Sequence, residues 1–150
     1  MLPIPVGTTA VLDVVVTEAH TVDFDDMGRV HPVYATYTMA KHFEEAGRKL
    51  LLRHLEPGEA GIGRSVSVEH LAPSWVGDRL RVTARCVEVR DGRLTCECRA
   101  TDSYGRALGH GTTVQLVRPA PLIEARVSEE ARLSRRHPLD ADGAPIPGRG

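Results

Sequence analysis

Three polar side chains have types and spacing suited to proton transfer. Thr36 stands at the start of an apolar helical repeat, Glu44 lies further along that repeat, and His70 lies on a segment that alternates apolar and polar residues. A hydroxyl beside the positive end of a helix can stabilise a developing oxyanion, and a carboxylate with an imidazole can relay a proton. Thr36, Glu44 and His70 are therefore candidate catalytic residues.

Each of the three also has a structural interpretation. Thr36 could be the N-cap of the helix, a role that Thr38 could fill equally well. Glu44 flanks the apolar stripe and could reach solvent or an ion pair, whereas enclosure would raise its pKa and suit it to act as a general base. His70 lies on the apolar face of its strand, where a histidine is commonly a hydrogen-bonded core residue.

A single long helix is predicted over residues 35–55, because apolar side chains recur there at spacings of three and four. Its end is set by Glu56-Pro57-Gly58, where proline and glycine stop a helix. The residues of the apolar stripe are Met39, Ala40, Phe43, Ala46, Gly47, Leu50 and Leu51. Carboxylate Glu44 lies at the edge of this stripe, whereas Glu45 points away from it.

Strands are predicted on both sides of the helix. A β-branched run predicts one strand over residues 8–16, and residues 23–32 have the Asp, Gly and Pro content of a loop. After the helix, alternation with a period of two predicts a half-buried strand over 65–73. Three further strands are predicted over 79–86, 94–100 and 109–117, the first two joined by a hairpin turn at Asp91-Gly92.

This order of elements predicts an α+β domain. A helix with one apolar stripe is covered if an antiparallel β-sheet wraps around it, and a single hotdog fold, with one long central helix, satisfies both elements. Since such a sheet has exposed edges, two subunits are expected to pair edge to edge as a homodimer. Beyond Pro119 the composition changes, Ser128 could cap one short helix, and residues 140–150 are expected to be flexible.

Composition excludes several classes of protein. The 150 residues are 41% hydrophobic and 26% charged, which is typical of one globular domain, and 19 basic against 20 acidic residues argue against a nucleic-acid binder. No apolar run is long enough for a membrane span, and three cysteines cannot pair completely, so a cytoplasmic protein is expected. Cys96 and Cys98 fit a core-facing strand better than a zinc site, and no histidine has metal-ligand spacing, so we expect no metal.

Several stretches of the sequence together resemble the fluoroacetyl-CoA thioesterase family. The resemblance rests on VYAT ending at Thr36, the helix with Glu44, the LEPGE turn, Gly63, VEH ending at His70, and GHGT over 109–112. It implies a hotdog thioesterase domain over 1–118, a C-terminal extension over 119–150, and hydrolysis of a small or medium acyl-CoA without metal. It also implies that Thr36, Glu44 and His70 are catalytic and that no cofactor is needed, coenzyme A being part of the substrate.

Two features, the lid and one arginine, depart from the pattern of that family. Met27 and Val30 stand where the fluoroacetyl-specific enzyme has lid phenylalanines, and Gln115 stands where it has an arginine. The resemblance implies that Met27, Val30 and the backbone of Gly63 line the acyl site. Coenzyme A is anionic, so a basic rim is expected, with Arg64, Arg79, Arg81 and Arg85 as candidates; as an alternative, these arginines form the wet face of ordinary strands.

Two other functions are compatible with these residues. One is a hotdog enoyl-CoA hydratase or dehydratase, and the other is a non-catalytic module that binds acyl-CoA. For a thioesterase, Thr36 is either a nucleophile or an orienting hydroxyl, His70 moves the proton, and Glu44 orients His70 or activates water. The sequence alone is compatible with both an acyl-enzyme and direct attack by water.

Overall fold

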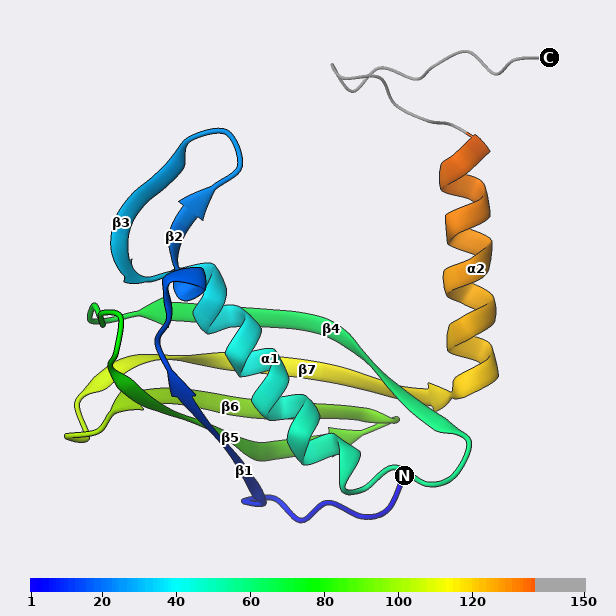
Figure 1. Cartoon of the computed structure of the whole chain (residues 1–150). Coiled ribbons are helices and arrows are strands. Elements are labelled where there is room, and N and C mark those ends of the chain that lie inside the picture. The colour runs from blue at the N-terminus through cyan, green and yellow to red at the C-terminus, as the bar shows by residue number, and fades with distance from the viewer. Residues whose placement is uncertain (137–150) are drawn as a thin grey trace.

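A five-stranded antiparallel sheet curls around one long helix in the computed structural model, which describes residues 1–136 (Figure 1). The helix is α1 (Thr36–Leu52), and the strand order is β1-β5-β6-β7-β4. The strands are β1 (Thr9–Val15), β4 (Glu59–His70), β5 (Arg79–Arg90), β6 (Arg93–Asp102) and β7 (Ala107–Pro119). The predicted α+β architecture is confirmed.

The apolar stripe of α1 forms the centre of the core. Six residues of the predicted stripe are buried, whereas Ala40 is half-buried, and Thr38 and His42 are buried in addition. The six are Met39, Phe43, Ala46, Gly47, Leu50 and Leu51. Long basic side chains on the opposite side still reach the sheet, since Arg48 donates to the Gly61 carbonyl at 2.8 Å and Lys49 to the Val11 carbonyl at 2.8 Å. The helix ends at Leu52, slightly before the predicted end.

The central strands turn every second side chain toward α1. These inward residues on β5 and β6 are all buried: Leu80, Val82, Ala84, Cys86, Leu94, Cys96, Cys98 and Ala100. Asp91 and Gly92 both have positive φ, at 53° and 71°, which is the geometry of a two-residue hairpin turn. Burial raises the pKa of Cys96 and of Cys98 to about 12, so these thiols are core side chains, as predicted.

Residues 23–32 are a β-ribbon, so the predicted loop is wrong. A short 3₁₀ helix, η1 (Glu18–His20), leads into β2 (Thr21–Phe24), which pairs with β3 (Gly28–Tyr34). Gly28, at φ +67°, lets the chain reverse after the acidic turn. Pro32 is tolerated because β3 belongs to a two-stranded ribbon, in which each strand is an edge strand. Proline has no backbone N–H to donate, and an edge strand can accommodate this.

Strand β4 starts earlier than predicted and is more exposed. It begins at Glu59, whereas the alternation is visible only from Ser65, because Gly61 and Gly63 contribute no side chain to the pattern. The strand is an edge of the sheet, and Val66 is 39% and Ile62 41% exposed. A bulge at Arg64 interrupts its pairing with β7 between Gly63 and Ser65.

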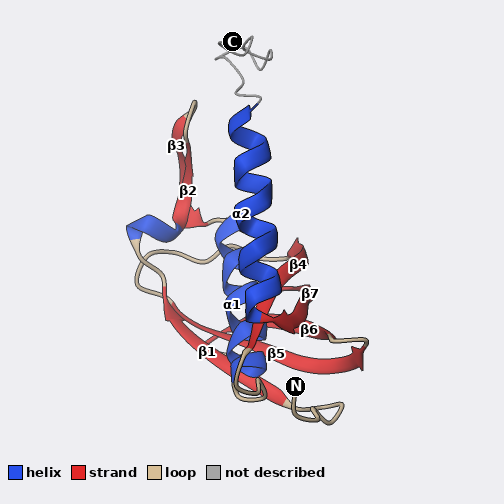
Figure 2. Cartoon of the chain, turned by 90° about the vertical axis from the view of Figure 1, so that its right-hand side faces the viewer, coloured by secondary structure: helices blue, strands red, loops and turns tan. Residues whose placement is uncertain are grey.

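A second long helix follows the sheet directly. Helix α2 (Ala120–Arg136) rises from the end of β7 away from the sheet in Figure 1, and its upper half extends beyond the five-stranded sheet in Figure 2. Ser128 lies in the middle of α2, so the expected short helix capped by Ser128 is wrong. Pro121 explains the early start, because proline is well tolerated in the first turn of a helix. The predicted flexible segment 140–150 lies outside the described residues.

Replacing Phe43 by alanine is expected to lower the free energy of unfolding by about 3–5 kcal/mol. Phe43 is fully buried between α1 and the sheet, so the truncation leaves a cavity in the centre of the core. Urea unfolding followed by circular dichroism measures the change. The control is Leu52→Ala, because Leu52 on the same helix is 57% exposed and its truncation should cost far less; equal losses would contradict this description of the core.

Candidate active site

The Thr36 hydroxyl and the His70 imidazole form a hydrogen-bonded pair. The Thr36 Oγ1 atom lies 3.0 Å from His70 Nδ1, and His70 Nε2 lies 3.0 Å from the Ala72 carbonyl oxygen. A carbonyl oxygen can only accept a hydrogen bond, so Nε2 must carry the proton. In the neutral imidazole Nδ1 is then the basic nitrogen, and it accepts the hydrogen bond from the Thr36 hydroxyl. This is the arrangement needed to remove a proton from Thr36.

The start of α1 places Thr36 at the positive end of the helix. The N-cap is Ala35, which makes no side-chain cap bond, so neither Thr36 nor Thr38 has the capping role that the sequence leaves open. The Ala35 N–H is instead held by the His20 carbonyl at 2.9 Å. Thr36 is exposed, and the first N–H groups of a helix have no partner within it, so they can bind an oxyanion.

His70 is fixed by the chain that follows it. Leu71 N–H donates to the Leu108 carbonyl at 2.8 Å, which holds the end of β4 against β7. The ring of Tyr34 meets the imidazole edge-on, with centroids 6.1 Å apart at 75°. The Tyr34 N–H in turn donates to the Ser74 carbonyl at 2.8 Å. The tautomer and the orientation of His70 are therefore set by backbone groups and by one aromatic ring.

Glu44 lies against Gly63, away from the pair formed by Thr36 and His70. A Cβ atom on Gly63 would overlap Glu44 Oε1, so only glycine lets the carboxylate lie against the strand at this point. Glu44 is exposed to solvent. Thr36 and Glu44 are separated by about 12 Å along the axis of the helix, and His70 and Gly63 by about 23 Å along the strand. A single chain thus carries two separate parts of the candidate site.

Gln115 lies beneath Glu44. Its side-chain Nε2 donates to the backbone carbonyl of Glu44 at 3.0 Å, and its residue exposure is 1%. Among the described residues, its Oε1 has no hydrogen-bond partner. This neutral amide occupies the position where the family resemblance gives an arginine, and it ties β7 to the middle of α1.

The other predicted site residues lie on the β2–β3 ribbon and on the sheet. Met27 lies in the turn of the β2–β3 ribbon and is 71% exposed, and Val30 lies on β3. Arg64 is exposed at the bulge of β4. Arg81 pairs with Asp13 at 2.9 Å and Arg85 approaches Glu97 at 3.9 Å. Such pairs are typical of the solvent-exposed face of a sheet. In the described part of the chain, no three metal-ligating side chains are grouped.

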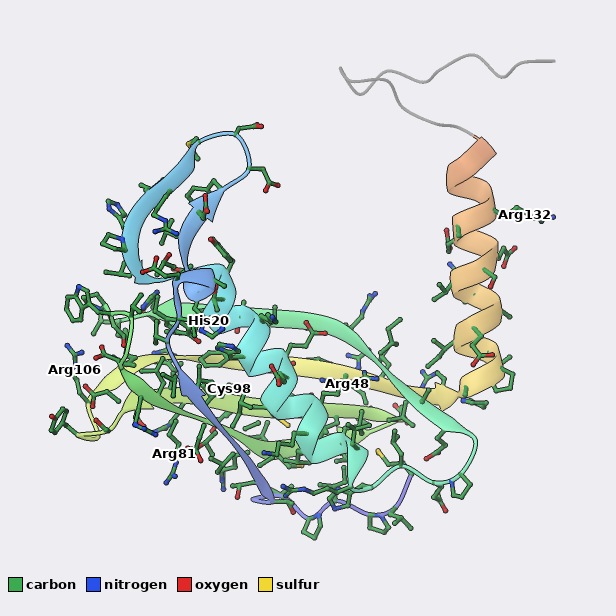
Figure 3. The ribbon with its side chains drawn as sticks, in the orientation of Figure 1. His20, Arg48, Arg81, Cys98, Arg106 and Arg132 are labelled. Atoms are coloured by element: carbon green, nitrogen blue, oxygen red, sulfur yellow. The ribbon has the colours of Figure 1, made fainter. Side chains whose placement is uncertain are left out.

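A Tyr34–His42–His20 cluster, in which Tyr34 and His42 are buried, lies behind the site, and sequence reasoning misses it. The Tyr34 hydroxyl lies 2.6 Å from His42 Nδ1, and the rings of His20 and His42 meet edge-on at 5.1 Å. Figure 3 shows His20 at the start of α1. His42 falls on the buried stripe of α1, which is the signal that could have identified it as a core histidine with a hydrogen-bond partner.

The fold is shared with solved hotdog proteins. A hot-dog-like protein from Thermanaerovibrio acidaminovorans is 24% identical, covers 84% of this chain and 92% of its own, and gives a TM-score of 0.75. This similarity shows the fold alone. Comparison with curated proteins gives no significant match.

The family model for the fluoroacetyl-CoA-specific thioesterase FlK matches residues 16–120, and the chain belongs to this family. A hypothetical protein of Thermus thermophilus, described as a thioesterase superfamily member, is 43% identical, with 90% of this chain and 98% of that chain covered and a TM-score of 0.87. The fluoroacetyl-CoA thioesterase FlK is 28% identical over 85% and 98% of the two chains, with a TM-score of 0.77. The protein is thus a thioester hydrolase that acts on acyl-CoA.

The stability of the fold should fall as the pH drops below about 6.5 because of His42. Burial, followed by the proximity of His20, lowers the pKa of His42 from the ordinary value of 6.5. The unfolded chain therefore binds this proton at a higher pH than the folded chain, so acid favours unfolding. Thermal unfolding measured across this range should show a shallower pH dependence for His42→Gln than for the wild type. The control is His110→Gln, an exposed histidine; equal slopes in all three proteins would contradict the prediction.

Proposed function

We propose that this protein is a homodimer that hydrolyses a small or medium acyl-CoA, with Thr36, Glu44 and His70 as catalytic residues and with no metal or cofactor. The observation that carries the proposal is the hydrogen bond from the Thr36 hydroxyl to His70 Nδ1 at the N-terminus of α1. The thioester carbonyl would lie at this helix end, where unpartnered backbone N–H groups and the helix dipole favour a developing negative charge.

Two routes of hydrolysis use the same groups. In the first, Thr36 Oγ1 attacks the carbonyl carbon, its proton moves to His70 and then to the sulfur as the C–S bond breaks, and water later releases the acyl group. In the second, water attacks directly, His70 takes its proton, and Thr36 orients the substrate. In either route Glu44 activates water or orients His70. The products are the free acid and CoA.

The free edge of β4 favours the dimer. This strand is twelve residues long, forms one edge of the sheet, and exposes Ile62 and Val66. A long edge with exposed apolar side chains is a template for pairing with another strand. A second copy, related by a two-fold axis, would extend the sheet across this edge.

The two separate parts of the site support the same dimer. If the two β4 strands pair antiparallel, with the axis at Ser67, the extra residue of the bulge at Arg64 brings His70 opposite the partner subunit's Gly63. The Thr36–His70 pair of one subunit then approaches the carboxylate of the partner's Glu44. Each dimer would hold two complete sites, each built from both subunits.

The kind of acyl group that the enzyme accepts is proposed from the residues expected to contact the substrate. Solved FlK variants hold acetyl-CoA, or fluoroacetate and CoA. In this chain Met27 and Val30 would contact the acyl group together with the backbone of Gly63, and Arg64 would bind a phosphate of coenzyme A. Neutral Gln115 in place of an arginine favours an acyl group other than fluoroacetyl.

Replacing His70 by alanine is expected to lower kcat by about 10²–10⁴-fold, because the general base is lost. Release of free CoA thiol, measured over acyl-CoAs of increasing chain length, tests this and also identifies the preferred acyl group. The matched control is His110→Ala, since His110 is exposed and its Nε2 lies 3.4 Å from Glu69 Oε2 on the surface of the sheet.

Unchanged hydrolysis of every acyl-CoA by His70→Ala would reject the mechanism. Binding of acyl-CoA by the wild-type protein without thiol release would indicate a binding module. Hydration of an enoyl-CoA in place of thiol release would indicate a hydratase.

Mixing two inactive variants tests whether the site is shared between subunits. His70→Ala and Glu44→Gln homodimers are unfolded, mixed in equal amounts and refolded together. In a shared site, each heterodimer has one site with both substitutions and one intact site, so roughly a quarter of the wild-type activity should return for random pairing of a symmetric dimer. Sites confined to one subunit would give no recovery.

Glu45→Gln is the matched control for the carboxylate. Glu45 is adjacent to Glu44 and exposed on α1, so its substitution changes the same charge without touching Gly63. It should retain full activity. An equal loss for Glu45→Gln and Glu44→Gln would mean that the helix charge, and not the position of Glu44, determines the rate.

A further inference from the structure

Helix α2 stands away from the subunit that carries it. Its base is fixed by the Ala120 N–H, which donates to the Gly58 carbonyl at 2.8 Å, beside the start of β4. The rest of the helix extends past the free edge of β4, clear of the sheet (Figures 1 and 2). Most of the stability of a helix in a protein comes from packing of its apolar face, so a second surface that covers α2 would stabilise it.

One side of α2 is apolar. Ile123, Val127 and Ala131 follow each other at a spacing of four and form a stripe, which we call the α2 stripe. Ile123 is half-buried at the base of the helix, and Val127 is 55% exposed. Ala125 lies on the opposite side of the helix. The α2 stripe is therefore uncovered over most of its length.

A second uncovered apolar surface lies at the other end of the sheet. It is formed by the loop after β4 and by the turn between β6 and β7, and we call it the end patch. Its residues are Leu71, Trp75, Val76 and Tyr104, which are 50%, 50%, 43% and 95% exposed. Figure 3 shows Arg106, in this region, and Arg132, near the free end of α2, far apart in the subunit. A helix cannot cover the end patch of its own subunit.

The loop of the end patch is held in place by polar bonds. The Asp78 carboxylate accepts bonds from Ser74 Oγ and from the Trp75 N–H, both at 2.8 Å. Arg106 donates to the Pro73 carbonyl at 3.1 Å. Its apolar side chains therefore remain turned to solvent on a fixed backbone, as in a preformed docking surface.

A two-fold axis within β4 brings the two surfaces together. The register that pairs His70 with the partner's Gly63 also carries Glu59, beside the base of α2, beyond the end of the partner's β4 and toward the loop of its end patch. From there α2 would run for about 25 Å, and the end of a five-stranded sheet is about 19 Å wide at a strand spacing near 4.8 Å. The helix therefore has the length needed to cross the end of the partner's sheet.

We propose that α2 is an intersubunit arm whose stripe packs on the end patch of a second copy of this chain. This inference rests on the dimer of the proposed function. The arm would cover the loop that contains Ala72, whose carbonyl fixes the tautomer of His70. Each subunit would thus brace the loop behind the partner's reactive imidazole.

A cysteine pair tests the proposal in the full-length protein. Val127→Cys on the α2 stripe and Tyr104→Cys in the end patch are combined in one chain, which is treated with a short bismaleimide and analysed on a denaturing gel. The native cysteines Cys86, Cys96 and Cys98 are buried and should not react. A covalent dimer should be the main product, while each single variant should give none. The matched control, Ala125→Cys with Tyr104→Cys, places the thiol on the opposite side of α2 and should cross-link weakly.

Light scattering and thiol release on the same samples separate the possible failures. A dimer that does not cross-link, or that cross-links equally in both pairs, would overturn the arm. A monomer would overturn both the arm and the proposed dimer. A dimer that cross-links only through Val127 but releases no thiol from any acyl-CoA would support the arm and reject the proposed function.

Discussion

The close approach of α1 to the sheet is the constraint on which the site depends. A Cβ atom on Gly47 would lie 2.5 Å from Thr113 Cγ2, and one on Gly61 would lie 2.5 Å from Leu51 Cδ2. Glycine at these crossings leaves room for one side chain, Thr113 of β7 or Leu51 of α1, where two side chains would clash. Since packed interiors adjust little, the helix has one position on the sheet. Thr36 is then held at His70, and Glu44 at Gly63.

The candidate site combines an exposed hydrogen-bonded pair, Thr36 and His70, with a buried support. Thr36 is open to solvent, so a thioester can reach it, whereas Tyr34 and His42 behind it are buried and hydrogen-bonded to each other. The support carries no net charge at neutral pH, because burial keeps His42 neutral and raises the pKa of Tyr34. No buried charge has to be compensated, and the orientation of His70 is set by neutral groups alone.

Sequence predicts the parts of this fold that have a clear period. Helix α1 and strands β5 and β6 follow from their apolar spacing, and Asp91-Gly92 marks the hairpin between them. Prediction fails in two places. Gly61 and Gly63 have no side chains, so the first half of β4 shows no alternation of apolar and polar residues. Pro32 suggests a loop in place of β3. The types of Thr36 and His70 suggest their chemistry, but the Ala72 carbonyl that fixes the tautomer is a backbone group, and no residue pattern reports it.

The single-residue bulge at Arg64 determines to which face of the sheet the side chains of each half of β4 point. Gly63 and His70 are an odd number of positions apart, so an uninterrupted strand would turn them to opposite faces. Both nevertheless face α1, Gly63 toward Glu44 and His70 toward Thr36. The extra residue at the bulge shifts the alternation of side chains by one position, so Gly63 and His70 point to the same face of the sheet. Loss of one residue here would leave the amino-acid types of the site intact and turn half of it away from the helix.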